Sequence, residues 1–542
     1  MRGLMMDQAL TITSIMRHAE AQHGDREIVS ITHDHPRHRY SYREAFKRVR
    51  KLANALQSLG LKPFQSVATL AWNDFRHLAL YYGISCAGFV CHTINPRLFA
   101  EQIIYIANHA EDRCIFVDPV FVPLLEGIVD RLESVQTIVI LAGNDSMPET
   151  SLPNVYCYED LLAEQSDSFD WPDLEENAAS SLCYTSGTTG NPKGVLYSHR
   201  SNVLHSYAAA LPDSMGLSAT DAVLPVVPMF HANAWGLNYA IPMVGAKYVL
   251  PGPMTGNAEA LINLMQEEQV TMAAGVPTVW LGLLQYLDKS GQTLSSLERT
   301  VVGGAACPLS IMDEFRDKHG VETFHAWGMT ETSPLGTLCA LKPGFEDLTD
   351  EDKQLVRAKQ GRPVYGVELK ITDDEGQDFP WDGQSFGALK IRGPWVASGY
   401  FNSSDESAHD GDGWFETGDV ATIDVNGYMQ ITDRTKDVIK SGGEWISSIE
   451  LENVAVGHPK IVEAAVIGVP HPKWSERPLL VAVTEAGADL DKKEILDYMT
   501  GKVAKWWIPD DVAFVDEIPH TATGKISKLQ LRKQFQDYSL PA

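Results

Sequence analysis

The segment from Tyr184 to Gly194, which reads YTSGTTGNPKG, combines glycines with small hydroxylated residues directly after an apolar, strand-like run. Glycine backbones and free amides can surround phosphate oxygens without obstruction by side chains. The segment is not a Walker A loop, because Pro192, Lys193 and Gly194 stand where that loop requires Gly-Lys-Ser/Thr. An ordinary surface turn is the alternative for any few of these residues. We predict a phosphate-binding loop made of Thr185, Ser186, Gly187, Thr188, Thr189, Gly190 and Lys193.

A second segment, HAWGMTETS from His325 to Ser333, begins like a buried strand and ends in polar residues. Glu331 supplies a hard carboxylate oxygen of the kind that Mg²⁺ binds, and Trp327 offers a flat surface for a purine. A buried tryptophan and a surface glutamate are the alternative. Together with the phosphate loop, the segment favours a nucleotide site.

Two segments nearer the C-terminus could complete that site. In the sequence TGD, Asp419 could accept both hydroxyls of a ribose, and Arg434 further along is available for the ribose or a phosphate. In PHTATGKISK, Lys525 lies in a Gly-containing loop. A lysine on such a loop can reach into a cleft and stabilise charge that develops during phosphoryl or nucleotidyl transfer. Taken singly, a Gly-Asp turn and a solvated lysine would explain both segments.

The elements that must position these residues form an α/β pattern. Apolar runs bounded by Gly or Pro alternate with helical patterns, which predicts a large body with parallel-rich sheets packed with helices. A strand over residues 180–184 leads into the phosphate loop, and Ser201 can cap the helix that follows. A second strand over residues 300–302 leads through Gly303 and Gly304 to a helix near Pro308.

The elements become shorter after Asp437, where a helix begins near Ser447 and Glu450 in a capping-box pattern. Apolar strands follow, then a helix over about residues 492–503, and together these elements indicate a small α+β unit of ordinary domain size. We therefore expect two domains, an N-terminal body over residues 1–435 and a C-terminal domain over residues 436–542.

The charge balance limits the partners of the chain. Its 542 residues carry 44 Lys and Arg against 71 Asp and Glu, a formal net charge of -27. Such a field repels polyanions, so we expect neither nucleic acid nor an anionic membrane as a partner. An anionic nucleotide must then be held by local amides, cations or Mg²⁺. The 7 cysteines include no Cys-x-x-Cys pair, which indicates a reducing compartment without structural zinc.

Two long uncharged stretches, Ala222–Ala246 and Thr271–Leu287, could be mistaken for membrane spans. Both contain prolines, and the second is shorter than a typical span, so buried core around a ligand cleft is the better interpretation. The short apolar run at the N-terminus is interrupted by Asp7, too early for a signal-peptide core. We expect a cytoplasmic location.

In this order and at these separations, the four segments resemble the adenylate-forming acyl-CoA synthetase superfamily, from about Thr13 to Phe535. YTSGTTGNPKG looks like the phosphate loop of that family, GWFETGD its ribose motif, DRTKDVIKSGGEWIS its hinge and PHTATGK its catalytic-lysine motif. The resemblance implies an enzyme that uses Mg²⁺, ATP and CoA. A substrate carboxylate attacks the α-phosphorus of ATP, and the CoA thiolate then attacks the acyl-adenylate and releases AMP.

The resemblance implies a role for each matching position. The phosphate loop with Lys193 would hold the phosphates, Glu331 and Thr185 would bind Mg²⁺, Asp419 with Arg434 would hold the ribose, and Lys525 would catalyse adenylation. The adenine would lie between two segments, Gly304, Ala305 and Ala306 on one side and His325, Ala326, Trp327, Gly328, Met329 and Thr330 on the other. Because the usual Gly-Glu-Pro-like turn of the family is Gly-Ala-Ala here, adenine contacts from it should be mainly backbone.

The second half-reaction implies a mobile C-terminal domain. In the family this resembles, the domain turns about a hinge residue, which is Lys436 here, and withdraws the catalytic lysine. A loop then meets the pantetheine channel of CoA. In this chain the loop comprises Ser441, Gly442, Gly443, Glu444 and Trp445.

The segment PMFHANAW bears on the acid. Amino-acid-activating relatives carry Asp after its Phe to pair an ammonium group, whereas this chain has His231, so a plain carboxylic acid is favoured. His231 could gate or contact the carboxylate, although a packed core histidine is the alternative. If the segment is helical, Trp235 shares the face of His231 and shortens an acyl tunnel, with Gly303 also lining the pocket.

That combination is similar to the methylmercaptopropionate-activating branch of the medium-chain acyl-CoA synthetases, which belongs to the bacterial dimethylsulfoniopropionate demethylation pathway. We expect 3-methylmercaptopropionate or a similar short- or medium-chain acid, since thioethers contact aromatic rings favourably. A general short- or medium-chain fatty acyl-CoA synthetase, acyl transfer to a carrier-protein thiol or to oxygen, and a non-catalytic nucleotide sensor remain open. Relatives suggest a homodimer.

Overall fold

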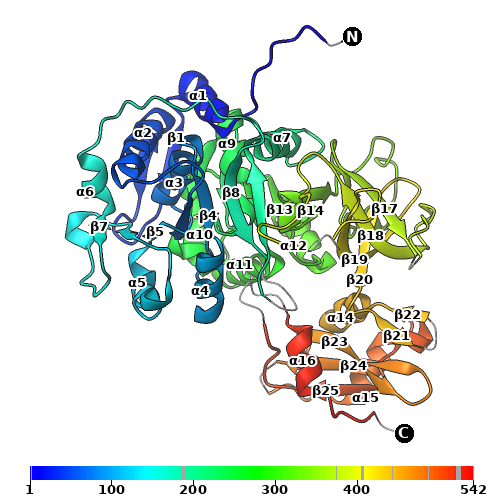
Figure 1. Ribbon diagram of the computed structural model, residues 1–542. Helices are drawn as coiled ribbons and strands as arrows, with labels where there is room; N and C mark the ends of the chain where they lie inside the picture. The colour runs from blue at the N-terminus through cyan, green and yellow to red at the C-terminus, as the bar shows by residue number, and fades with distance from the viewer. Residues whose placement is uncertain are drawn as a thin grey trace. The chain divides into compact units, whose positions relative to one another are not determined.

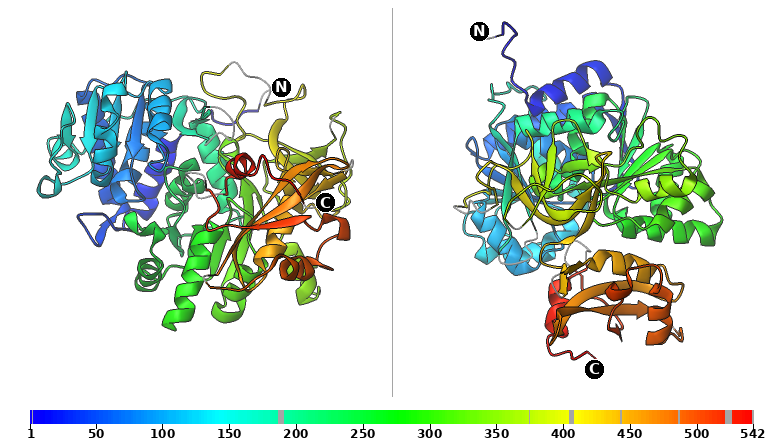
Figure 2. Two further views of the ribbon diagram at one scale, coloured as in Figure 1. Left: turned by 90° about the horizontal axis from the view of Figure 1, so that it is seen from below. Right: turned by 90° about the vertical axis from the view of Figure 1, so that its right-hand side faces the viewer.

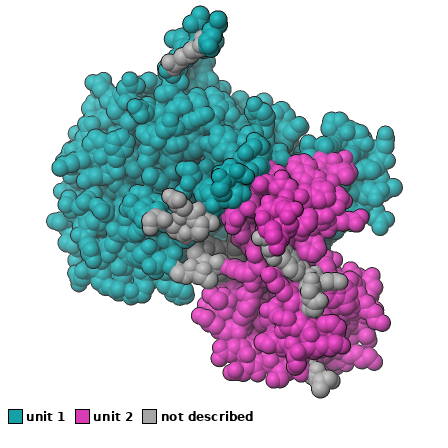
Figure 3. Space-filling view, turned by 45° about the vertical axis from the view of Figure 1, so that its right-hand side comes forward, with its two compact units in different colours: residues 1–368, 392–415 teal, residues 369–391, 416–542 magenta. Residues whose placement is uncertain are grey.

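The structure is a computed structural model that describes residues 1, 3–185, 191–373, 375–403, 408–441, 444–485, 487–520 and 526–540. The chain divides into two compact units (Figure 3). Unit 1 comprises residues 1–368 and 392–415, and unit 2 comprises residues 369–391 and 416–542. The units interleave in sequence, because residues 369–391 pack with the C-terminal residues. The functional boundary expected at Lys436 stays a prediction.

The larger sheet of unit 1 has nine strands among the described residues, in the order β16-β15-β14-β13-β12-β10-β11-β1-β2. Its neighbours from β14 to β1 pair in parallel, and β2, β15 and β16 pair antiparallel at the two edges. The strands are β1 (Glu27–Ser30), β2 (His38–Ser41), β10 (Ala222–Pro225), β11 (Lys247–Leu250), β12 (Met272–Gly275), β13 (Arg299–Val302), β14 (Glu322–Gly328), β15 (Leu335–Leu338) and β16 (Arg362–Pro363).

The second sheet of unit 1 has seven strands among the described residues, in the order β7-β6-β5-β3-β4-β8-β9. All neighbours pair in parallel except β8 and β9, which form an antiparallel pair around the phosphate-loop segment. The strands are β3 (Ser66–Leu70), β4 (Val90–Thr93), β5 (Cys114–Val117), β6 (Thr137–Ile140), β7 (Val155–Cys157), β8 (Ala179–Tyr184) and β9 (Gly194–Ser198).

Helices connect these strands (Figure 1). The helix expected from Ser201 begins earlier, because the Ser198 hydroxyl accepts a hydrogen bond from the Ser201 amide at 3.0 Å and so caps it. The helices of unit 1 are α1 (Ile12–His23), α2 (Tyr42–Ser58), α3 (Phe75–Cys86), α4 (Ala100–His109), α5 (Val122–Glu126), α6 (Tyr158–Ala163), α7 (His199–Ala210), α8 (Ala232–Trp235), α9 (Leu237–Val244), α10 (Ala258–Glu267), α11 (Pro277–Ser290), α12 (Leu309–His319) and α13 (Asp350–Arg357).

The uncharged stretches belong to the core of unit 1. Residues 222–246 form β10, α8 and α9, and residues 271–287 form β12 and most of α11. Apolar side chains of β10, β12, α10, α11 and α12 pack into one cluster around Trp280, which has no exposed surface. In the part of the chain that the structure describes, no helix combines the length and apolar character needed to cross a membrane.

The described residues of unit 2 form two sheets. In the first, β17 (Glu368–Thr372), β18 (Phe386–Arg392), β19 (Phe415–Ile423) and β20 (Met429–Arg434) lie side by side in that order. The second sheet contains β21 (Ile439–Ser441), β22 (Glu444–Ile446), β23 (Ile461–His471), β24 (Ser475–Thr484) and β25 (Asp511–Phe514). Its long central pair, β23 and β24, is antiparallel.

The second sheet is covered by α14 (Ser448–Val456), α15 (Lys492–Met499) and α16 (Lys528–Gln534). Helix α16 packs on β23 (Figure 2). As expected, Ser447 caps α14, with its hydroxyl accepting from the Glu450 amide at 3.1 Å. Helix α15 ends before the predicted residue 503, because Thr500 is extended and Gly501 has a φ of 81°. The predicted class, an α/β body with a smaller α+β part, is confirmed.

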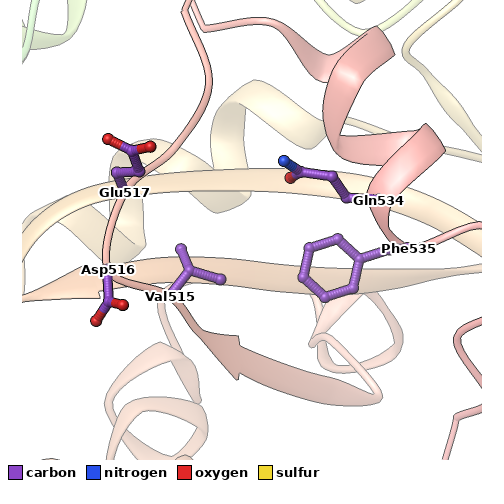
Figure 4. Close-up of a pocket in the computed structure, with 5 residues that line it drawn as sticks. All are labelled: Val515, Asp516, Glu517, Gln534 and Phe535. Carbon is purple, nitrogen blue, oxygen red and sulfur yellow. The ribbon is translucent and has the colours of Figure 1, made fainter.

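A pocket of about 510 Å³ lies in unit 2, and none of the residues that line it is a predicted site residue (Figure 4). It is lined by Val515, Asp516, Glu517, Gln534 and Phe535. The Phe535 ring points toward Val515, and the two carboxylates point away from that ring (Figure 4).

Candidate active site

The two ends of the phosphate loop are held together by the β8–β9 pair. Tyr184 lies opposite Gly194, and the Thr185 amide donates to the Lys193 carbonyl at 2.9 Å. The Tyr184 hydroxyl also bonds to Nδ1 of His109 at 2.7 Å. Residues 186–190, the centre of the predicted loop, lie outside the described residues. The ladder therefore brings Thr185 and Lys193 together at the base of the loop.

Glu331 lies on a short turn directly after β14, and its residue surface is only 5% exposed. The Tyr400 hydroxyl donates to Glu331 Oε1 at 2.7 Å. The Lys193 ammonium group lies 4.8 Å from the centroid of the Tyr400 ring. Tyr400 thus contacts both a predicted phosphate-binding cation and the predicted Mg²⁺ ligand.

The segment Trp395–Phe401, which we call the strap, connects the Glu331 turn to strand β9. At the turn, the Ala397 amide donates to the Glu331 carbonyl at 2.7 Å, and the Ser333 hydroxyl donates to the Trp395 carbonyl at 2.6 Å. At the strand, the Phe401 amide donates to the Gly194 carbonyl at 2.8 Å. Backbone hydrogen bonds therefore set the spacing between Glu331 and the phosphate loop.

Sequence reasoning missed Tyr400. Its partners, Lys193 and Glu331, are far from it in the chain, so no local pattern connects them. The only local signal in the sequence is a Gly-Tyr pair that follows a short Gly-containing segment. The tyrosine is recognised through its two contacts in the folded unit.

The predicted adenine segments are neighbours in the larger sheet. Strands β13 and β14 are parallel, with Val302 beside His325, so the turn after β13 and the end of β14 lie at the same edge. His325 is buried, and burial lowers its pKa to about 4. Its Nε2 accepts from the Cys307 amide at 3.3 Å and its Nδ1 bonds to the Ala358 carbonyl at 3.0 Å. The imidazole therefore holds the 304–307 turn in place.

The segment that carries Trp235 differs from the expected helix. Residues Ala232, Asn233, Ala234 and Trp235 have φ values of 44°, 57°, 51° and 58°, which form a left-handed turn. His231 is extended and the four residues after it are left-handed, so the right-handed helix on which the expected shared face of His231 and Trp235 depended is not formed. His231, half-buried, precedes the turn, and its amide donates to the Pro228 carbonyl at 3.1 Å.

Trp235 reaches Gly303, the residue predicted to line the same pocket. A Cβ placed on Gly303 would lie 3.2 Å from Cη2 of the indole. Trp235 is 8% exposed, so the ring is packed in unit 1. The left-handed turn thus directs the indole to the start of the Gly303–Ala306 segment.

The predicted ribose pair forms within unit 2. Asp419 and Arg434 are opposite each other on β19 and β20, and Arg434 Nε lies 2.7 Å from Asp419 Oδ1. Asp419 is buried, whereas Arg434 is partly exposed. The Thr417 hydroxyl accepts from the Asp419 amide at 3.1 Å and donates to the Leu389 carbonyl at 2.8 Å. The carboxylate is therefore held in one place beside a cation.

The predicted hinge is anchored by neighbouring residues. Asp433 Oδ2 accepts hydrogen bonds from the Ser448 amide and hydroxyl, both at 2.6 Å. The Lys436 carbonyl accepts from Arg532 at 3.2 Å, and burial lowers the pKa of the Lys436 ammonium group. Ser441 ends β21. Glu444 and Trp445 lie in β22, and Gly442, Gly443 and Lys525 lie outside the described residues.

The residues fit a Mg²⁺ ion that is bound together with a nucleotide. Within the described ranges, no three His, Cys, Asp or Glu side chains gather as a self-sufficient metal site. Mg²⁺ keeps several waters and takes one or two carboxylates plus substrate phosphates. A single buried carboxylate, Glu331, near the base of a phosphate loop matches that arrangement.

Comparison with known proteins identifies the family. Residues 16–401 match the model described as AMP-binding enzyme, and residues 450–525 match its C-terminal domain. The chain is 54% identical over 537 residues to a 3-methylmercaptopropionyl-CoA ligase of Ruegeria lacuscaerulensis, covering 99% of each chain. It is 53% identical over 540 residues to a medium-chain-fatty-acid–CoA ligase of Ectopseudomonas oleovorans, covering 100% of this chain and 98% of that one.

Solved structures agree in fold. The anthranilate CoA ligase AuaEII in complex with anthranoyl-AMP superimposes with a TM-score of 0.87 at 26% identity, covering 98% of each chain. ATP-bound MatB from Rhodopseudomonas palustris superimposes with a TM-score of 0.82 at 26% identity, covering 97% of this chain and 99% of that one. The predicted family and activity are confirmed, with ATP and CoA as co-substrates. The chain belongs to the AMP-binding enzyme family, in which it is an acid:CoA ligase.

Proposed function

We propose that the enzyme activates 3-methylmercaptopropionate or a similar short- or medium-chain acid as its CoA thioester. In the first half-reaction, a carboxylate oxygen bonds to the α-phosphorus of ATP while the bond to pyrophosphate breaks. In the second, the CoA thiolate bonds to the acyl carbon and AMP leaves. The observation that carries the proposal is the strap, because it joins the base of the phosphate loop to the buried Glu331 carboxylate.

The residues of the proposed site divide the work of adenylation. Loop amides and Lys193 hold the phosphates, and Asp419 with Arg434 holds the ribose. Glu331, with Thr185, would hold Mg²⁺, which supplies positive charge against the phosphate oxygens when bound. Lys525 stabilises the negative charge that develops as pyrophosphate leaves. These positive groups oppose the repulsion of an acidic protein for an anionic substrate.

The adenine and CoA sites are also proposals. Adenine would contact the backbone of Gly304, Ala305 and Ala306 and the segment from His325 to Thr330, where the side chain of His325 acts from behind the turn. The 441–445 loop would meet the pantetheine arm after the C-terminal residues turn about Lys436. We propose a homodimer in the cytoplasm, which sedimentation and cell fractionation would test.

The proposed acid rests on His231, Trp235 and Gly303. An aromatic wall at Gly303 would shorten the acyl pocket and provide a ring for a thioether to contact. The relative named as a 3-methylmercaptopropionyl-CoA ligase supports this acid. The almost equally similar medium-chain-fatty-acid–CoA ligase supports a second candidate, a general medium-chain acyl-CoA synthetase.

An acid panel distinguishes the two candidates. With ATP, Mg²⁺ and CoA, kcat/KM for 3-methylmercaptopropionate should exceed that for hexanoate and octanoate. Much faster turnover of the fatty acids would reject the sulfur-containing acid and leave the second candidate. AMP release that depends on CoA would exclude a carrier-protein thiol or oxygen as the acceptor.

The variant Lys525→Ala tests the catalytic assignment. Adenylation should be abolished, whereas thioester formation from preformed acyl-adenylate should be retained. The same variant separates the enzyme from a nucleotide sensor, since a sensor would not need this lysine for ATP binding. Unchanged adenylation would refute the role of Lys525.

A further inference from the structure

The left-handed turn at residues 232–235 is an unusual piece of backbone. All four residues carry a Cβ, and left-handed φ values are unfavourable for such residues because the Cβ approaches the following carbonyl oxygen. Each of the four is at most 8% exposed. Backbone of this kind persists where the surrounding structure over-determines it, and it is concentrated at functional sites. Something in the surroundings must therefore hold the turn.

The side chain of Asn233 provides that hold. Its Nδ2 donates to the Ser181 hydroxyl and to Oδ1 of Asn202, both at 3.3 Å. Nδ2 of Asn202 in turn donates to the Ser180 hydroxyl at 2.9 Å. Asn233 and Asn202 have at most 1% of their surface exposed. This buried network ties the turn to helix α7 and to strand β8, the strand that leads into the phosphate loop.

The C-terminal end of the turn is held by close packing. Gly236 has a φ of 75°, and a Cβ on it would lie 2.4 Å from Nδ1 and Cε1 of His205. His205 is fixed because its Nε2 accepts from the Leu335 amide at 3.1 Å. Hydrogen bonds hold Asn233, and close packing against His205 holds Gly236. The Trp235 side chain lies between these two fixed positions and is directed toward Gly303.

We propose that Asn233 is a positioning residue that sets the acyl-chain length accepted by the enzyme, by holding the Trp235 indole against Gly303. The inference rests on the proposed function, in which this indole bounds the acyl pocket. Asn233 acts through Trp235 and does not itself contact the acid. Loss of the hydrogen bonds from its side-chain amide releases the turn from β8 and α7. The indole then no longer limits the depth of the acyl pocket.

Two substitutions at one position separate side-chain hydrogen bonding from backbone preference. Asn233→Ala removes the amide and leaves a Cβ at a left-handed φ, whereas Asn233→Gly removes the amide but favours that φ. We expect both variants to raise the kcat/KM ratio of octanoate to 3-methylmercaptopropionate at least tenfold, with the KM for ATP changed less than twofold. An Asn233→Gly enzyme with the wild-type ratio would overturn the inference, because local backbone preference would then suffice.

A double-mutant cycle tests the route through the indole. Trp235→Ala alone should change the same ratio, and adding Asn233→Gly should change it by less than twofold more. Independent effects that multiply would overturn the inference. The matched control is Asn238→Ala, an equally buried asparagine on α9 whose Oδ1 accepts from the Tyr248 hydroxyl. It should lower stability and leave the ratio unchanged; a shift as large as that of Asn233→Gly would assign the effect to general loosening.

Two further comparisons distinguish failure of this inference from misfolding of a variant and from failure of the proposed function. If Asn233→Ala fails to fold, Asn202→Ala removes the same network from its other member, and it should shift the ratio in the same direction. An unchanged ratio in folded Asn202→Ala would count against the network. Failure of the wild-type enzyme to form an adenylate with any acid would instead refute the proposed function.

Discussion

The hydroxyl of Tyr400 donates a hydrogen bond to the buried carboxylate of Glu331 at 2.7 Å. The face of the same ring receives the Lys193 ammonium group at 4.8 Å. One aromatic side chain thereby orients a carboxylate suited to Mg²⁺ and a cation suited to phosphate. Since both groups are expected to act on the same triphosphate, their relative position affects adenylation directly.

Tyr400→Phe removes the hydrogen bond and keeps the ring face for Lys193. A hydrogen bond to a charged group contributes about 1.5–3 kcal/mol, so we expect the adenylation rate to fall roughly tenfold or more. Binding of Mn²⁺ to the ATP complex, followed by electron paramagnetic resonance, should weaken in parallel. Tyr400→Leu loses both contacts and should be worse. Equal activity of the wild-type and Phe enzymes would show that the hydroxyl does not orient Glu331.

Asp419→Asn tests the ribose assignment. The wild-type carboxylate is held beside Arg434 at 2.7 Å and can accept two hydroxyl hydrogens, whereas an amide accepts them more weakly. We expect the KM for ATP to rise about tenfold. The control substrate is 2′-deoxyATP: the wild-type enzyme should discriminate against it, and the variant should do so much less. Undiminished discrimination would place the ribose elsewhere.

Gly236→Ala should destabilise unit 1. The φ of 75° is strained for any residue with a Cβ, and the new methyl group would meet His205 at 2.4 Å. We expect a loss of about 2 kcal/mol or more in the free energy of unfolding, measured with urea. Gly282→Ala on α11 is the matched control, because nothing lies within 4 Å of its Cβ position. That change should stabilise by about 0.5–1 kcal/mol. Similar losses in both variants would contradict the account of Gly236.

Acid should destabilise the enzyme through buried neutral histidines. Burial lowers the pKa of His205 to about 3 and that of His325 to about 4, whereas an unfolded histidine titrates near 6.5. Below pH 6.5 these histidines bind protons in the unfolded chain but not in the folded chain. The free energy of unfolding therefore has its full value above that pH and falls as the pH decreases toward 4. Each histidine contributes about 1.4 kcal/mol per pH unit in that window.

The measurement is the slope of unfolding free energy against pH between 6.5 and 4.5. His325→Gln can retain the hydrogen bond to the Ala358 carbonyl without a titrating group, so its slope should be shallower by about one proton. The variant is compared with the wild-type enzyme under identical conditions. Identical slopes would mean that His325 is already protonated in the folded enzyme over this range.

Local features of the chain were predictable where the residues that determine the structure lie within the same short segment. The Ser447 cap of α14, strand β8 before the phosphate loop, and strand β13 before Gly303 follow from turn residues and apolar runs. The end of α15 was predicted too late, since Gly501 stops the helix before its apolar pattern ends.

The linear order of YTSGTTGNPKG, HAWGMTETS, TGD and PHTATGK was sufficient to predict the family and its reaction, because each motif keeps its reactive groups within a few residues. Tertiary structure alone decided two further features. Tyr400 meets Glu331 and Lys193 only after the strap crosses from one strand to another. The turn that directs Trp235 is left-handed because Asn202 and Ser181, distant in sequence, hold Asn233. In this turn, hydrogen bonds between distant segments outweigh the local preference of the backbone for right-handed φ values. Those hydrogen bonds form only when the segments pack together.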